Sequence, residues 1–145
     1  EKWEQSYNLF KKAVAINDRS FTCWYGLSIA LSQLQKTDEA LSAIQKAVSI
    51  NPSSIEAQFL LGVSQRRMQK FAEAEKSLKE ANKLAKGKAA DVHWNLALLY
   101  AHNLKKYAEA ADHLEQYLKI KPNDTQVESV KKLIKQFRDK AAAGN

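Results

Sequence analysis

The 145-residue sequence is poor in the residues that interrupt helices and in those that build covalent frameworks. It holds four glycines, two prolines and a single cysteine, Cys23. One cysteine excludes an internal disulfide and a metal site with several cysteine ligands. No apolar run approaches the roughly 20 residues of a membrane-spanning helix, and no signal peptide is visible. The composition as a whole favours helices, and 27% of the residues are charged.

The first residues already follow a helical pattern, and Glu1 is not an initiator methionine. We therefore expect a piece of a longer protein, whose compartment stays open. The formal charge is +7, with denser basic stretches at 76–88 and 131–140. Acidic residues are interspersed in both stretches, so we interpret them as solvated outer faces of helices and disfavour a nucleic-acid surface.

Residues 37–50 are the clearest amphipathic helix of the chain. Asn51-Pro52 stops this helix, because proline lacks an N–H group and disfavours helix in the residue before it. Thr37 is the expected N-cap, followed by two acidic residues that suit the positive end of the helix dipole. Apolar residues recur at helical spacing, namely Ala40, Leu41, Ile44, Ala47, Val48 and Ile50.

The same pattern recurs 34 positions earlier, 34 positions later, and again after a step of 36. This repetition predicts an array of helix pairs. We expect half a repeat at 1–20, repeats at 21–54, 55–89 and 90–123, and a closing helix at 124–141. Two extra residues account for the longer step. One is expected in the turn at 103–106, and the other before Ala90. Expected helix-end signals are a cap from Ser20, capping boxes at Ser53 with Glu56 and Thr125 with Glu128, and a stop at Gly87.

These residues resemble the tetratricopeptide repeat family, whose pattern is Trp-x-x-Leu-Gly-x-x-Tyr, then Ala-x-x-x-Phe, a further Ala and a final Pro. The matching residues are Trp24, Leu27, Ser28, Leu31, Ala40, Ile44, Ala47 and Pro52, then Leu61, Gly62, Ala74, Leu78 and Ala81, then Leu96, Ala97, Tyr100, Ala110, Leu114 and Pro122. The resemblance implies an all-α, right-handed array of antiparallel helix pairs with a C-terminal capping helix. Residues 107–122 resemble the closing repeat of soluble bacterial arrays, so bacterial cytoplasm or periplasm is the expected setting.

The resemblance also implies an inner, concave wall formed by the first helix of each pair. We expect its apolar residues to line a groove without being needed for helix pairing, and contiguous exposed apolar surface marks a binding site. Aromatic residues and Arg are the types enriched at interface hot spots. The alternative is that the closing helix or a neighbouring copy covers them. The candidate groove residues are Tyr25, Ile29, Gln33, Phe59, Val63, Arg66, Arg67, Trp94, Leu98 and His102.

We expect a non-catalytic scaffold that binds a partner peptide or helix in this groove. Some members of the family clamp a C-terminal carboxylate with a Lys and Asn pair, but Tyr25 and Ile29 hold those places here. An enzyme, a metal and a cofactor are not expected, because Cys23 has no evident base and the three histidines, His93, His102 and His113, show no ligand spacing.

Three other functions remain open at this point. The apolar stripe at residues 3–16, left without a partner helix, could mediate self-association into a homodimer. The basic outer faces could bind nucleic acid, which would be strongly salt-dependent. The chain could also be a targeting arm of a larger enzyme.

Overall fold

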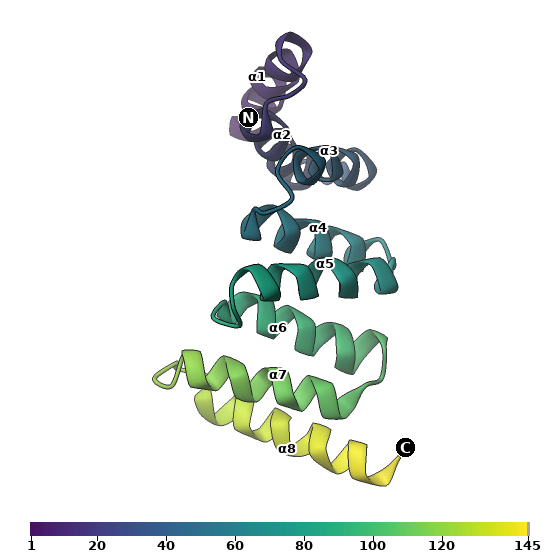
Figure 1. Ribbon diagram of the computed structural model, residues 1–145, viewed down its shortest axis with the longest axis vertical. Coiled ribbons are helices and arrows are strands. Elements are labelled where there is room, and N and C mark those ends of the chain that lie inside the picture. Colours follow the sequence, from purple (N-terminus) through teal and green to yellow (C-terminus); the bar gives the residue numbers. More distant parts are fainter. Residues whose placement is uncertain (145) are drawn as a thin grey trace. The chain divides into compact units, whose positions relative to one another are not determined.

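The computed structural model describes residues 1–144, and their regular structure is entirely helical (Figure 1). The elements are α1 Lys2–Ile16, α2 Phe21–Gln33, α3 Thr37–Ile50, α4 Ile55–Arg67, α5 Phe71–Leu84, α6 Ala90–Leu98, η1 Leu99–Asn103, α7 Tyr107–Ile120 and α8 Val127–Ala143. The all-α prediction is confirmed. The chain divides into two compact units, one ending at Ser77 and one starting at Leu78, so the boundary falls inside α5.

In the first unit, neighbouring helices of the series α1, α2, α3 and α4 pack on one another. Small side chains at the contacts let the helix backbones approach closely: Ala43, Ala47 and Ala57 are all at most 2% exposed. Gly26 serves α1 in the same way, because a Cβ atom at this position would overlap with the ring of Phe10. The predicted nesting of helices through small residues is therefore seen within this unit.

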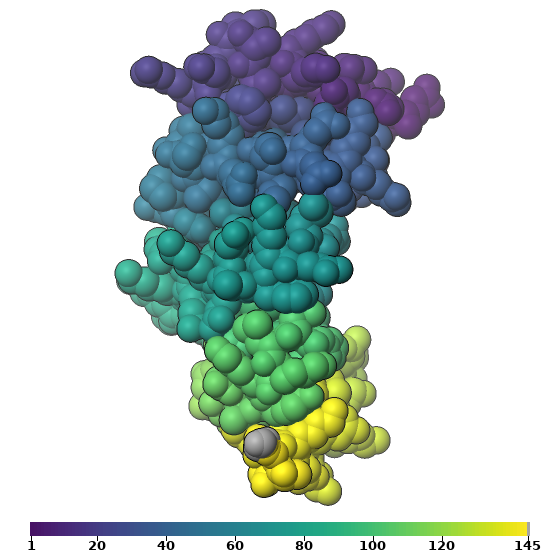
Figure 2. Space-filling model, turned by 90° about the vertical axis from the view of Figure 1, so that its right-hand side faces the viewer, coloured from purple at the N-terminus to yellow at the C-terminus, as the bar shows by residue number. Residues whose placement is uncertain are grey.

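In the second unit, α6 packs on α7, and α7 packs on α8. Figure 2 shows the side chains of α8, in yellow, against the green residues that precede it. The buried side chains that join these helices include Leu96, Leu114, Val130 and Phe137. The predicted closing helix thus covers an apolar face of α7, although it begins at Val127 and not at residue 124.

The turns between paired helices use a left-handed residue. Gln35 and Gln69 have φ angles of 59°, and the following N–H groups, of Lys36 and Lys70, bond back to carbonyls five residues earlier at 2.9 and 2.8 Å. This arrangement satisfies carbonyl groups that the helix end leaves unpaired. After α5 the equivalent left-handed residue is Lys86, with φ at 54°, and the N–H of Gly87 bonds back to the carbonyl of Asn82 at 2.9 Å. Gly87, the predicted stop, is therefore the second left-handed residue of this turn, with φ at 71°.

Of the two caps predicted at serines, one is confirmed and the other is wrong. Ser20 caps α2 as predicted. The predicted capping box at Ser53 is wrong, because Ser54 is the cap of α4 and accepts a hydrogen bond from the N–H of Ala57 at 3.1 Å. Ser53 lies one residue earlier in the loop, where its N–H donates to the side chain of Asn51 at 3.2 Å.

The caps predicted at two threonines are wrong. Thr37 is the first residue of α3, and the N-cap is Lys36, which makes no side-chain capping bond. The N-cap of α8 is Gln126 rather than Thr125. In that turn the carboxylate of Asp124 accepts a hydrogen bond from the N–H of Gln126 at 2.8 Å, which delays the start of the helix.

The extra residue predicted at 103–106 lies further upstream, inside the helix. Residues Leu99–Asn103 form the π-helix η1, in which each turn holds one residue more than an α-helix. The N–H of Leu104 bonds to the carbonyl of Leu99 at 3.0 Å, and the N–H of Lys106 bonds to the carbonyl of Tyr100 at 2.8 Å. The helix absorbs the inserted residue, so the turn to α7 does not need to lengthen.

Candidate functional site

The candidate residues of the first unit lie on two helices. Tyr25, Ile29 and Gln33 follow one another at four-residue steps on α2, and Phe59 and Val63 do so on α4. The four apolar side chains in this set are partly exposed, whereas Gln33 is exposed. None of them is sealed in the interior.

Tyr25 has a second role, in helix packing. Its ring stacks on that of Phe21 with 5.7 Å between centroids. It also packs against the buried cluster that includes Leu41 and Ile44 of α3. Burial raises the pKa of the Tyr25 phenol, and the negative charge of Glu56 adds to the shift. The expectation that this ring is not needed for helix packing is therefore wrong.

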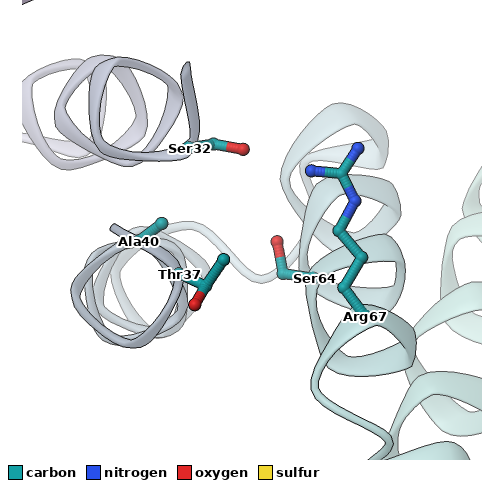
Figure 3. Close-up of a pocket in the computed structure, with 5 residues that line it drawn as sticks. All are labelled: Ser32, Thr37, Ala40, Ser64 and Arg67. Carbon is teal, nitrogen blue, oxygen red and sulfur yellow. The ribbon is translucent and has the colours of Figure 1, made fainter. Parts of the chain in front are cut away.

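Arg66 and Arg67 stand in the last turn of α4. Arg66 is partly exposed and Arg67 is exposed. Arg67 borders a small recess in which α2, α3 and α4 meet, with a cavity volume of only about 10 Å³ (Figure 3). The residues that line this recess are Ser32, Thr37, Ala40, Ser64 and Arg67.

The candidate residues of the second unit are Trp94 and Leu98 on α6 and His102 in η1. Trp94 and Leu98 are partly exposed, and His102 is exposed. The indole ring of Trp94 lies 5.3 Å, centroid to centroid, from the ring of Tyr117 on α7. Trp94 thus also supports helix packing, which again corrects the expectation from the sequence.

Tyr117 joins α7 to the turn before α8. Its hydroxyl donates a hydrogen bond of 2.9 Å to the carboxylate of Asp124. Burial raises the pKa of Tyr117, and the bond to Asp124 contributes. The pKa of Asp124 is lowered, first by the hydrogen bond from the N–H of Gln126 and then by that from Tyr117. A bulky residue is therefore suited to this position, since its ring and its hydroxyl meet different partners.

A histidine pair in the second unit was missed by sequence reasoning. The Nδ1 atoms of His93 and His113 are 2.9 Å apart, and Nε2 of His93 lies 2.9 Å from the carbonyl oxygen of Gly87. A carbonyl only accepts, so Nε2 of His93 carries a proton. In the neutral pair, Nδ1 of His93 then accepts from the Nδ1–H of His113. Burial and the neighbouring His93 lower the pKa of His113 to about 4.

Two features are absent from the part of the chain that the structure describes. Residues 1–144 contain no group of three or more His, Cys, Asp or Glu side chains placed to hold a metal ion. The same residues contain no helix that is both long enough and apolar enough to cross a membrane.

The family model described as the C-terminal ARM domain of tetratricopeptide repeat protein 21 matches residues 3–135. The chain belongs to the tetratricopeptide repeat family. A comparison with curated protein sequences finds no match. The bacterial origin suggested by the sequence stays a prediction.

Solved tetratricopeptide repeat structures share the fold at low sequence identity. A structure of MamA has a TM-score of 0.80 and 18% identity over 97% of this chain and 86% of its own. YrrB, described as having an unusual peptide-binding site, has a TM-score of 0.80 and 24% identity over 90% of this chain and 66% of its own. The first such domain of Spaghetti (RPAP3), bound to the HSP90 peptide SRMEEVD, has a TM-score of 0.74 and 19% identity over 85% and 94%.

The N-terminal helix of this tetratricopeptide repeat chain carries exposed apolar residues. Leu9 and Ile16 are 70% and 88% exposed, and Trp3 is 39% exposed. Leu9 stands 34 positions before Ala43, which is only 2% exposed in the cluster formed by α2 and α3. The face of α1 that holds Leu9 therefore corresponds to the face of α3 that another helix covers.

Proposed function

We propose that this tetratricopeptide repeat chain is a non-catalytic scaffold that binds a peptide or helix of a partner protein. The observation that carries the proposal is the row of partly exposed apolar side chains on α2 and α4 in the first unit, Tyr25, Ile29, Phe59 and Val63. Their helices are held rigidly by the buried clusters beneath them. Apolar surface on a rigid support is the usual basis of peptide recognition.

In the second unit we propose a further contact surface made of Trp94, Leu98 and His102. Trp94 presents a large ring that its contact with Tyr117 holds in place. A ring immobilised before binding loses little conformational entropy when a partner covers it. The peptide-bound RPAP3 structure and the described peptide site of YrrB support the same kind of role here.

Phe59→Ala and Trp94→Ala test the two surfaces separately. The full chain is first used to select binders from a random peptide display library, and the affinities of both variants for a selected peptide are then measured by fluorescence anisotropy. We expect Phe59→Ala to weaken binding by at least about tenfold, since a truncated aromatic anchor typically costs about 1.4 kcal/mol or more. Leu9→Ala, an exposed apolar residue on α1, is the matched control and should bind as the parent chain does.

The proposal is contradicted if neither Phe59→Ala nor Trp94→Ala reduces the affinity for any selected peptide. A loss in only one variant would restrict the binding surface to the unit that carries it. Circular dichroism of each variant separates lost binding from lost folding, because both side chains border packed helices.

A second function, self-association through α1, is favoured by the exposure of Leu9 and Ile16. Sedimentation velocity over a wide concentration range tests it. If α1 mediates a dimer, the sedimentation coefficient rises with concentration, and Leu9→Lys abolishes the rise because a buried unpaired charge is unfavourable. A coefficient independent of concentration in the parent chain excludes this function.

A further inference from the structure

A recess between α2 and α3 of the first unit is lined mainly by apolar side chains. It has a cavity volume of about 400 Å³, which lies at the lower end of the range for ligand pockets. Its floor consists of buried or partly buried residues, and its rim of exposed ones. We call it the Ala43 recess, and the residues that line it are Trp24, Leu27, Leu31 and Ala43 in the floor and Glu39, Ser42 and Lys46 at the rim.

The second repeat occupies the equivalent place with its own side chains. Ser77 stands 34 positions after Ala43, and Gln65 stands 34 positions after Leu31. The hydroxyl of Ser77 donates a hydrogen bond of 2.7 Å to the side-chain oxygen of Gln65, and both residues are buried. Ala43 and Leu31 cannot form such a bond, because neither side chain has a polar atom.

The third repeat occupies the same place with aromatic rings. His113 and Tyr100 hold the positions that Ala43 and Leu31 hold in the first repeat. The ring of His113 stacks on that of Tyr100 with 5.6 Å between centroids, and its Nδ1 lies 2.9 Å from that of His93. A flat ring on the second helix of the pair thus fills this place, whereas the one-carbon side chain of Ala43 leaves it open in the first repeat.

We propose that the Ala43 recess binds one aromatic side chain of a partner protein, whose ring takes the place that His113 holds in the third repeat. The floor offers the ring an apolar surface that includes the indole of Trp24. Aromatic pairs gain stability beyond the burial of their area. The indole N–H of Trp24 already donates to the carbonyl of Asp18 at 2.8 Å, so this ring is held in place before binding and loses little conformational entropy.

The rim favours a side chain of a polypeptide over a free small molecule. Glu39 and Lys46 are exposed and stand seven residues apart on α3, which is about 10 Å along the helix axis. This separation exceeds the width of one ring, so only a segment with charged groups on both sides of the ring can pair with both residues. A basic and an acidic residue flanking the aromatic one meet this requirement. The rim hydroxyl of Ser42 already donates to the carbonyl of Asp38 at 3.1 Å.

The Ala43 recess is separate from the surface of the proposed function. Trp24, Leu27 and Leu31 share one face of α2, because they follow one another at steps of three and four residues. Tyr25 and Ile29 are centred roughly 150° away around the same helix, at 3.6 residues per turn. The proposal therefore goes beyond the proposed function and does not depend on it.

Fluorine NMR of the full chain labelled with 5-fluorotryptophan tests the recess, because Trp24 lines it and the other two tryptophans, Trp3 and Trp94, do not. The probe is the end-blocked peptide Lys-Ala-Phe-Ala-Glu, and the comparison peptide has Leu in place of Phe. We expect the Trp24 signal to shift to saturation with the Phe peptide. The Leu peptide should bind about fivefold more weakly, because it lacks the aromatic contact.

Four results of this titration would overturn the proposal. The first is a Trp24 signal that does not saturate, and the second is equal affinity for the Phe and Leu peptides. The third is equal affinity for N-acetylphenylalaninamide, which carries the ring without charged neighbours and would indicate a small-molecule site. The fourth is a Trp24 shift on raising the concentration of the chain alone, which would place a second copy in the recess. A shift of Trp94 without Trp24 would support the proposed function and contradict the recess.

Ala43→Phe should fill the recess from α3, as His113 fills the equivalent place from α7. We expect it to abolish the saturating Trp24 shift while the thermal melt stays at or above that of the parent chain. Ala43→Ser is the matched control, since it introduces the residue of the second repeat, Ser77, and should retain binding. A saturating shift that persists in Ala43→Phe contradicts the proposal. If Ala43→Phe does not fold, the comparison of the Phe and Leu peptides on the parent chain decides by itself.

Discussion

The backbone determines which ring nitrogen of His93 carries the proton in the contact between His93 and His113. The carbonyl of Gly87 fixes the donor atom of His93, so His113 must donate from Nδ1 in the neutral pair. The ring of Tyr100 stacks on that of His113 at 5.6 Å. Burial and the neighbouring His93 disfavour a charged His113 in the folded second unit.

The second unit should lose stability in mild acid. The pKa of His113 is about 4 in the folded chain, against 6.5 for an unperturbed histidine. Between these values the unfolded chain binds more protons, so the free energy of unfolding rises as the pH rises from about 4 to 6.5 and is constant above that. Because the imidazole is partly exposed, we expect a change of roughly 1–2 kcal/mol over this window, measured by urea unfolding at several pH values.

His113→Phe should flatten this part of the pH profile, because it removes the titrating group but keeps a ring beside Tyr100. His102→Asn is the matched control, since His102 is exposed, and it should retain the slope. Nearby charged groups are Asp112, Lys79 and Glu109. An equal slope in His113→Phe and in the parent chain would contradict the assignment of the effect to His113.

Among the elements, α8 is attached to α7 by one arginine as well as by its apolar face. Arg138 donates to the carboxylates of Asp112 and Glu115 at 2.7 and 2.9 Å and to the backbone carbonyl of Ala108 at 3.3 Å. These groups lie 23 to 30 positions away in sequence. The bonds therefore link two helices, unlike the local pair of Lys131 and Glu128.

Arg138→Ala should destabilise the chain by about 1 kcal/mol, because a partly exposed network of two carboxylates and a carbonyl is worth more than an isolated surface pair. Lys131→Ala is the control and should change stability by less than about 0.5 kcal/mol. Both values come from urea unfolding, and 1 M salt should reduce the difference. Equal effects of the two substitutions would mean that Arg138 contributes only as a surface charge.

The sequence predicts where the helices lie better than it predicts their first and last residues. The apolar spacing of α3 and its recurrence predict where the helices lie, because that spacing reflects burial along the whole helix. The sequence places the caps of α4 and α8 one residue too early, at Ser53 and Thr125. The reason is that the side chains of Asn51 and Asp124 accept hydrogen bonds from backbone N–H groups two residues later, and the turns formed in this way shift the start of each helix. A π-helix leaves no pattern that distinguishes it from an α-helix with a longer turn.

For the molecule as a whole, the sequence predicts the fold and the family, and less of the site. The repeat period predicts which helix face each residue occupies, so the partial exposure of Phe59 and Val63 follows from it. It does not predict how far a ring also packs on the next helix, as Tyr25 and Trp94 do. The histidine pair could not be predicted, because a contact over 20 positions depends on where the π-helix takes up its extra residue.

The central claim is that α2 and α4 present a protein-binding surface, and a chemical-shift map of the full chain with one selected peptide tests it most directly. The account predicts that the largest shifts fall on the amides of Tyr25, Ile29, Phe59 and Val63, with smaller shifts along α3. Shifts confined to α1 or to the solvent-facing side of α3, with these four amides unchanged, would contradict it.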